Sequence, residues 1–127
     1  MLDPNFIILY VDDPRASARF YGDLLSLRTL EESPTFAMLA LRPGVMLGLW
    51  SRHTVEPAAA AGGGGTEIAF ALEPGPGSGA VDAVYADWVK RGLAIAQHPV
   101  DLDFGRTFVA LDPDRHRLRV FVPADPA

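Results

Sequence analysis

The side chains that could ligate a metal ion or act in catalysis are few and scattered. The sequence contains no cysteine and three histidines. His53 borders a glycine-rich stretch, His98 precedes a proline and His116 lies in a predicted turn, so none is spaced with another histidine or an acid as metal ligands are. A nucleophile-elbow serine and a dinucleotide fingerprint are absent, and Gly62–Gly65 lacks the Lys-Ser/Thr of a phosphate-binding loop. These residues offer no catalytic set.

Aromatic side chains offer a different chemistry, the stacking of a flat ligand. Trp50 closes a predicted strand after a run of small residues, where offset stacking on its indole would contribute about 0.5–1.5 kcal/mol beyond area burial. Its alternative role is core or dimer packing. Phe36, Phe104 and Phe108 are each predicted either as pocket wall or as plain core. Arg106 either binds a ligand carboxylate in bidentate fashion or is solvated.

Length and composition set the frame for these residues. The 127 residues are 49% hydrophobic, enough for one domain with its own core. A net charge of -5, with Lys90 as the only lysine, argues against a nucleic-acid partner. The first apolar stretch ends at Asp12, too early for a membrane span, and no basic leader precedes it. We therefore expect a cytoplasmic protein with no membrane partner.

The first half of the chain reads as a strand, a helix and three more strands. Residues 5–11 form an apolar β-rich run, and Asp12-Asp13-Pro14 then supplies a helix cap with proline at the first helical position. The helix is amphipathic through Phe20, Tyr21, Leu24 and Leu25. The predicted strands that follow are residues 27–32, 35–41 and 45–51.

The second half repeats this order after a connector. Residues 53–65, rich in alanine and glycine, are predicted to be flexible and to separate two modules, of about residues 1–55 and 66–127. A strand at 66–72 and a Gly/Pro-rich loop at 73–79 precede a helix whose apolar stripe includes Trp88, predicted as core. The remaining predicted strands are residues 93–97, 106–111 and 117–122.

Two motifs in this order resemble a known family. The run from Leu9 to Tyr21, with Asp, Ser and Phe-Tyr leading into a helix, resembles the opening of vicinal-oxygen-chelate proteins, the glyoxalase/bleomycin-resistance/dioxygenase superfamily. Residues 104–108 and 112–120 resemble its last hairpin. The resemblance covers the whole chain and implies an α+β fold of two βαβββ modules, whose curved mixed sheets enclose a cleft.

Within that family the sequence looks most like the phenazine-antibiotic resistance branch. The stretches that carry this narrower resemblance are Pro4-Asn5, Tyr10-Val11, Phe20-Tyr21, Leu49-Trp50-Ser51, Glu67-Ile68 and residues 104–108. It implies a homodimer that sequesters a planar aromatic antibiotic without changing it chemically.

The resemblance also indicates where a metal would be held. Metal-dependent members use His, Gln or Glu from the first and last strands of each module, and the matching positions here are Phe6, residues 46–50, Glu67 and Arg119. A lone carboxylate opposite an arginine cannot build such a site, so we predict no metal and no cofactor. Glu67 and Arg119 then either anchor a ligand or form an internal salt bridge.

Together these observations predict a protein without catalytic residues that binds a small planar aromatic antibiotic or metabolite independently of metal. The predicted ligand contacts are Trp50, Glu67, Arg106, Phe36, Phe104, Phe108 and Arg119. The alternative is an enzyme of the same fold, a lyase, isomerase or dioxygenase that uses a metal through Glu67.

Overall fold

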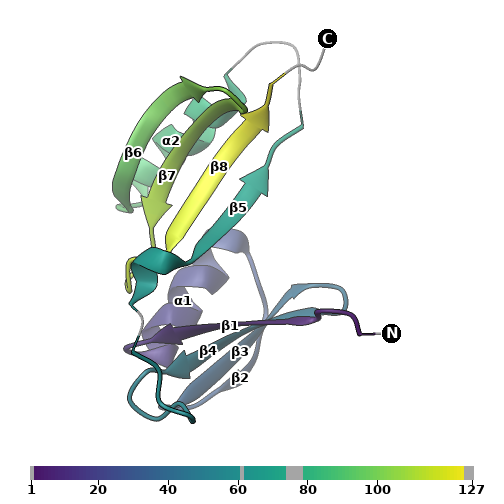
Figure 1. Ribbon diagram of the computed structural model, residues 1–127, viewed down its shortest axis with the longest axis vertical. Coiled ribbons are helices and arrows are strands. Elements are labelled where there is room, and N and C mark those ends of the chain that lie inside the picture. The colour runs from purple at the N-terminus through teal and green to yellow at the C-terminus, as the bar shows by residue number, and fades with distance from the viewer. Residues whose placement is uncertain (1, 61, 74–78, 125–127) are drawn as a thin grey trace. The chain divides into compact units, whose positions relative to one another are not determined.

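A computed structural model describes residues 2–60, 62–73 and 79–124 of the chain (Figure 1). The chain divides into two units, Met1–Ala61 and Gly62–Ala127, and each contains one helix and one four-stranded mixed sheet. Most of the predicted Gly/Pro-rich loop, residues 74–78, lies outside the described residues. Neither described helix is long and apolar enough to cross a membrane.

Unit 1 has the predicted β-α-β-β-β order. Its sheet has the strand order β1-β4-β3-β2, in which β1 pairs with β4 in parallel and the other neighbours are antiparallel. A parallel pair needs a long crossover connection, which α1 supplies. The elements are β1 (Phe6–Val11), α1 (Pro14–Leu25), β2 (Thr29–Glu32), β3 (Phe36–Arg42) and β4 (Val45–Ser51).

Local sequence explains where α1 begins and ends. The Asp13 carboxylate accepts hydrogen bonds from the backbone N–H groups of Arg15 and Ala16, at 3.1 and 3.2 Å, and Pro14 takes the first turn. Ser26 adopts a left-handed conformation at the C-cap (φ 55°) and ends the helix. The helix buries Tyr21 against the sheet side of the unit, as its amphipathic pattern predicts.

Unit 2 repeats the arrangement, with strand order β5-β8-β7-β6 and α2 along one face of the sheet (Figure 1). Trp88 of α2 is 6% exposed and packs edge-to-face on Phe70 and Phe108, which confirms it as core. The elements are η1 (Gly63–Gly65), β5 (Glu67–Ala71), α2 (Ala80–Lys90), β6 (Ala94–Leu102), β7 (Gly105–Leu111) and β8 (Arg117–Pro123).

One strand is longer than the sequence pattern predicts. β6 continues to Leu102 instead of ending at Gln97, although Pro99 cannot donate a ladder hydrogen bond. The pairing of β6 with β7 shifts between Gln97 and Val100, so the proline sits at an irregularity of an edge strand, where it is tolerated.

One glycine of the predicted connector, Gly63, packs closely against a turn of unit 2. A Cβ atom on Gly63 would overlap the carbonyl oxygen of Asp114 and lie 2.9 Å from the backbone nitrogen of His116. That turn is itself fixed, because Asp112 Oδ1 accepts the N–H groups of Asp114 and His116 at 2.9 and 2.8 Å. The turn at residues 112–116 therefore leaves no room for a side chain at position 63, so Gly63 has a packing role in addition to its place in the connector.

We predict that Gly63→Ala lowers the free energy of unfolding by about 1–3 kcal/mol, the usual cost of overpacking a close contact. Gly64→Ala is the matched control, because nothing lies within 4 Å of a Cβ atom there. Denaturant unfolding of both variants measures the difference. An equal free energy of unfolding for Gly63→Ala and Gly64→Ala would contradict the prediction, because it would mean that the turn can move away from the added methyl group without loss of stability.

Candidate functional site

The face of the unit 1 sheet opposite α1 carries an apolar surface. Strand register places nine side-chain positions of β1, β4 and β3 on this outer face in three rows. The rows are Phe6, Met46 and Ala40; Ile8, Gly48 and Met38; and Tyr10, Trp50 and Phe36. Most of the alternate residues face α1 and form the core; those at most 3% exposed are Leu9, Val11, Ala37, Leu39, Leu47 and Leu49, whereas Ile7 is 41% exposed.

Four residues of the outer face surround a hollow of about 370 Å³. These are Phe6, Ile8, Phe36 and Trp50, and we refer to the space as the aromatic hollow. Phe36 and Trp50 meet edge-to-face, with ring centroids 6.3 Å apart and planes at 89°. Phe6 and Ile8 are each 43% exposed, so apolar surface is open to a ligand.

Sequence reasoning identified half of this lining. Trp50 and Phe36 were predicted as ligand contacts and lie together on the hollow. The sequence pattern predicts no ligand contact at Phe6, which stands at a family metal position, or at Ile8, which lies within a predicted strand. The alternation of Phe6, Ile8 and Tyr10 along one strand is the signal that would have placed them on the same face as Trp50.

Glu67 and Arg119 form an ion pair in unit 2. Arg119 Nε donates to Glu67 Oε2 at 2.8 Å, Nη2 donates to Oε1 at 3.4 Å, and Nη1 donates to Thr107 Oγ1 at 3.1 Å. Arg117 Nε lies 3.1 Å from Glu67 Oε1. The hydrogen bond from Arg119 is the main cause that lowers the pKa of Glu67, against the opposing effect of partial burial. The predicted salt bridge is therefore present, and the alternative role of anchoring a ligand stays a prediction.

Phe104 lies beside this ion pair. The guanidinium carbon of Arg119 is 5.7 Å from the centroid of the Phe104 ring, and Phe121 meets the same ring edge-to-face at 5.7 Å. Phe104 is nevertheless 44% exposed. The structure thus brings together three of the residues predicted as ligand contacts: Phe104, Arg119 and Glu67.

The two other predicted contacts, Arg106 and Phe108, lie on the opposite face of the sheet, beneath α2. Phe108 is fully buried and packs edge-to-face on Tyr85 and Trp88, so it belongs to the core. Arg106 donates to both carboxylate oxygens of Asp82 in α2, at 3.0 and 3.2 Å. Its position two residues before Phe108 places it on the helix side, which the sequence pattern alone did not reveal.

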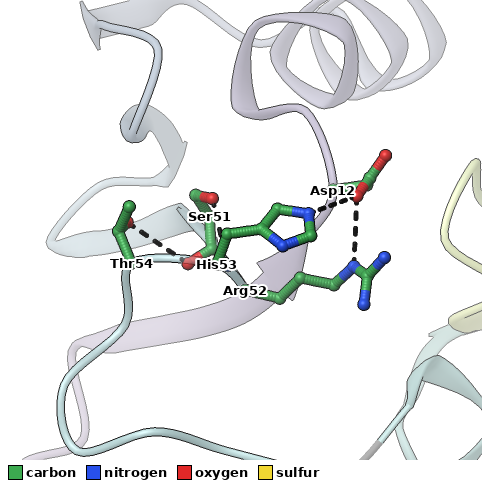
Figure 2. Close-up of polar contacts among 5 residues, drawn as sticks. All are labelled: Asp12, Ser51, Arg52, His53 and Thr54. Atoms are coloured by element: carbon green, nitrogen blue, oxygen red, sulfur yellow. Dashed lines mark hydrogen bonds and ion pairs between the residues drawn. The ribbon is translucent and has the colours of Figure 1, made fainter.

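Two histidines have acidic partners, one 41 residues away in the sequence and one four residues away. His53 Nε2 lies 2.7 Å from Asp12 Oδ1, and Arg52 Nε donates to the same oxygen at 3.1 Å (Figure 2). The bond to His53 and then that to Arg52 lower the pKa of Asp12. This exposed cluster joins the ends of β1 and β4, next to the row that holds Trp50. In unit 2, His116 Nδ1 lies 2.8 Å from Asp112 Oδ2, and both side chains are buried.

Comparison with known proteins places this architecture in a family. The family model described as the glyoxalase/bleomycin resistance protein/dioxygenase superfamily matches residues 4–120. The chain belongs to this superfamily. The doubled βαβββ order and the two mixed sheets are those that the family resemblance implied.

Several known proteins are similar over nearly the whole chain. The phenazine antibiotic resistance protein EhpR of Enterobacter agglomerans is 27% identical over 125 residues, which cover 94% of this chain and 91% of the relative. Protein ATC0852 of Agrobacterium tumefaciens, solved by NMR in solution, is 50% identical, with a TM-score of 0.85 over 98% of this chain and 100% of its own. A Nocardioides glyoxalase/bleomycin resistance protein/dioxygenase is 25% identical, with a TM-score of 0.77 over 100% of this chain and 87% of its own.

The residues at the superfamily's metal positions do not suit a divalent cation. In unit 1 they are Phe6 and the β4 stretch of Met46, Leu47, Gly48, Leu49 and Trp50. In unit 2 the carboxylate of Glu67 is bound to Arg119 and contacts Arg117, whose charges oppose a cation. Within the described residues, no three His, Asp or Glu side chains form a group that could hold a metal ion. We therefore derive no chemistry through a metal.

We predict that Glu67→Gln lowers the free energy of unfolding at pH 7 by about 1 kcal/mol or less, as for other partly exposed ion pairs. Because the folded-state pKa of Glu67 is lowered, its contribution is present above its ordinary value of 4.5 and is lost as the pH falls through the lowered folded value. The difference from wild type should thus shrink in acid. Denaturant unfolding at pH 7 and below pH 4 measures it, with Glu32→Gln in exposed β2 as control.

Proposed function

We propose that this protein binds and sequesters a small planar aromatic molecule, an antibiotic or a metabolite, without metal and without changing the ligand chemically. The observation that carries the proposal is the aromatic hollow on unit 1, with Trp50 and Phe36 on its lining. In a cell that meets such an antibiotic, sequestration would confer resistance.

The size and surface of the hollow suit that ligand class. Small-molecule sites commonly enclose about 300–1,000 Å³, and the hollow of about 370 Å³ lies at the lower end of this range. A flat ligand can stack on one aromatic ring and present its edge to another. Phe36 and Trp50 already offer this geometry, since their planes are at 89° to each other.

The relative from Enterobacter agglomerans supports the biological role. It is named a phenazine antibiotic resistance protein, and a phenazine is a flat, three-ring aromatic molecule. In unit 2, we propose the exposed ring of Phe104, with Arg119 against it, as a further surface for ligand contact.

The chemistry of Glu67 favours binding over metal-dependent catalysis. The lyases, isomerases and dioxygenases that use this fold with a metal need ligands free to coordinate it, whereas Glu67 is engaged by Arg119 and Arg117. We further propose a homodimer, because β1 is an edge strand with exposed apolar side chains that a partner would cover. The cytoplasmic location expected from the sequence stays a proposal.

We predict that chelator-treated protein binds phenazine with saturable quenching of tryptophan emission, and that mass spectrometry recovers the phenazine intact. Trp50→Ala should weaken binding measured by calorimetry about fivefold or more, because truncating a central aromatic contact costs about 1 kcal/mol or more. Trp88→Phe is the matched control, since Trp88 lies in the core of unit 2. This variant should retain both binding and quenching.

Conversion of the phenazine, or binding that requires an added divalent metal, would contradict the proposal in favour of an enzyme. If wild type and Trp50→Ala bind phenazine with equal affinity, the aromatic hollow is not the binding site. Binding of a panel that includes a quinone would then show whether another surface is responsible.

A further inference from the structure

The centre of the outer face of unit 1 has no side chain. Gly48 occupies the middle of the middle row, between Ile8 on β1 and Met38 on β3. The other eight positions of the face carry side chains, and seven of these are larger than alanine. The middle strand therefore contributes no side chain at the centre of this face.

Two rings fill the space that a side chain at this position would take. A Cβ atom on Gly48 would lie 2.8 Å from Cε1 of Phe6 and 3.1 Å from Cζ of Phe36. Phe6 belongs to the row on one side of Gly48 and Phe36 to the row on the other. Both rings thus lean inward from opposite sides of the face and rest against the Gly48 backbone.

Backbone conformation does not explain the glycine. The φ angle of Gly48 is not in the left-handed region, in contrast to those of Gly44, Gly92 and Gly105. Glycine inside a strand is unfavourable, because it loses more conformational freedom than other residues and offers nothing to pack. The requirement at position 48 is for space.

We propose that Gly48 determines the ligand specificity of the aromatic hollow. Because Gly48 has no side chain, the rings of Phe6 and Phe36 can pack directly against the strand backbone, and the hollow then admits a flat, uncharged fused-ring ligand. The inference rests on the proposed function and names its ligand class. A side chain at position 48 would lift both rings into the space bounded by Ile8 and Trp50.

The lining explains why the ligand is uncharged. None of its four residues carries a charge that could pair with a carboxylate. A carboxylate held among them would lose hydration without gaining an ionic partner, which is costly. A neutral ring system loses little hydration and gains contact with three aromatic side chains, Phe6, Phe36 and Trp50.

Gly48→Ala tests the proposal without threatening the fold. The backbone accepts any residue, and the closest atom belongs to the outer end of Phe6, which is 43% exposed and free to move. Affinity for phenazine, measured by calorimetry, should fall about tenfold or more, as expected for one added methyl group in a fitted apolar pocket. Gly64→Ala adds the same methyl group to open space and should bind as wild type.

A double variant identifies the ring that transmits the effect. Leucine at position 6 is shorter than phenylalanine, so in a Phe6→Leu background Gly48→Ala should cost less affinity than in wild type. Strictly additive losses would overturn the role of Phe6.

Phenazine-1-carboxylate, ionised at pH 7, should bind at least about tenfold more weakly than phenazine. Equal affinity for the two would overturn the uncharged ligand class.

A measurement without ligand separates this inference from the proposed function. Ring-to-ring NMR contacts of Phe6, Phe36 and Trp50 should change in Gly48→Ala and not in Gly64→Ala. If wild type binds no phenazine, the proposed function fails. The role of Gly48 is tested separately, and it fails if the ring contacts are unchanged in Gly48→Ala. If wild type binds phenazine and Gly48→Ala binds it equally well, only the inference about Gly48 fails.

Discussion

Parallel pairing of β1 with β4 is the constraint on which the candidate site depends. It inserts the last strand of unit 1 between the first and the third, so that β4 becomes the middle of the outer face. The backbone bond from Met46 to Asn5, at 3.0 Å, and that from Arg52 to Val11, at 2.8 Å, fix this register at its two ends. A slip of one residue would turn Phe6 and Ile8 toward α1 and expose the core positions. The polar contacts of Asp12 with Arg52 and His53 reinforce the register at the end nearest Trp50.

Unit 2 has the same strand order and a different surface chemistry. Where unit 1 places Met46, Gly48 and Trp50 on its middle strand, unit 2 places Arg117, Arg119 and Phe121 on β8. Arg119 is 15% exposed, and its partial burial is tolerable because Glu67, Thr107 and the Phe104 ring all engage it. One topology thus supports an apolar hollow in one unit and a paired charge in the other, because the topology fixes positions and leaves side-chain identity open.

The sequence predicted the fold well because the signals that define it are local. The apolar run of β4, the Asp13-Pro14 helix start and the Trp88 stripe each act within a few residues, and the structure confirms the element types and their order. The site was harder because it depends on which face each strand presents. Trp50 and Phe36 could be identified by residue type, whereas Phe108 and Arg106 turned out to face α2. The pairing of Asp12 with His53 links residues 41 positions apart, which local patterns do not reveal.

The physical character of the hollow bears on whether binding leads to catalysis. An enzyme must stabilise the transition state more than the bound substrate, which requires groups that respond to developing charge. Dispersion and hydrophobic contact with Phe6, Ile8, Phe36 and Trp50 depend on shape and area, which change little as bonds polarise. Such contacts stabilise a ground-state ligand and leave its reactivity almost unaltered. A site of this composition is therefore suited to holding a molecule intact.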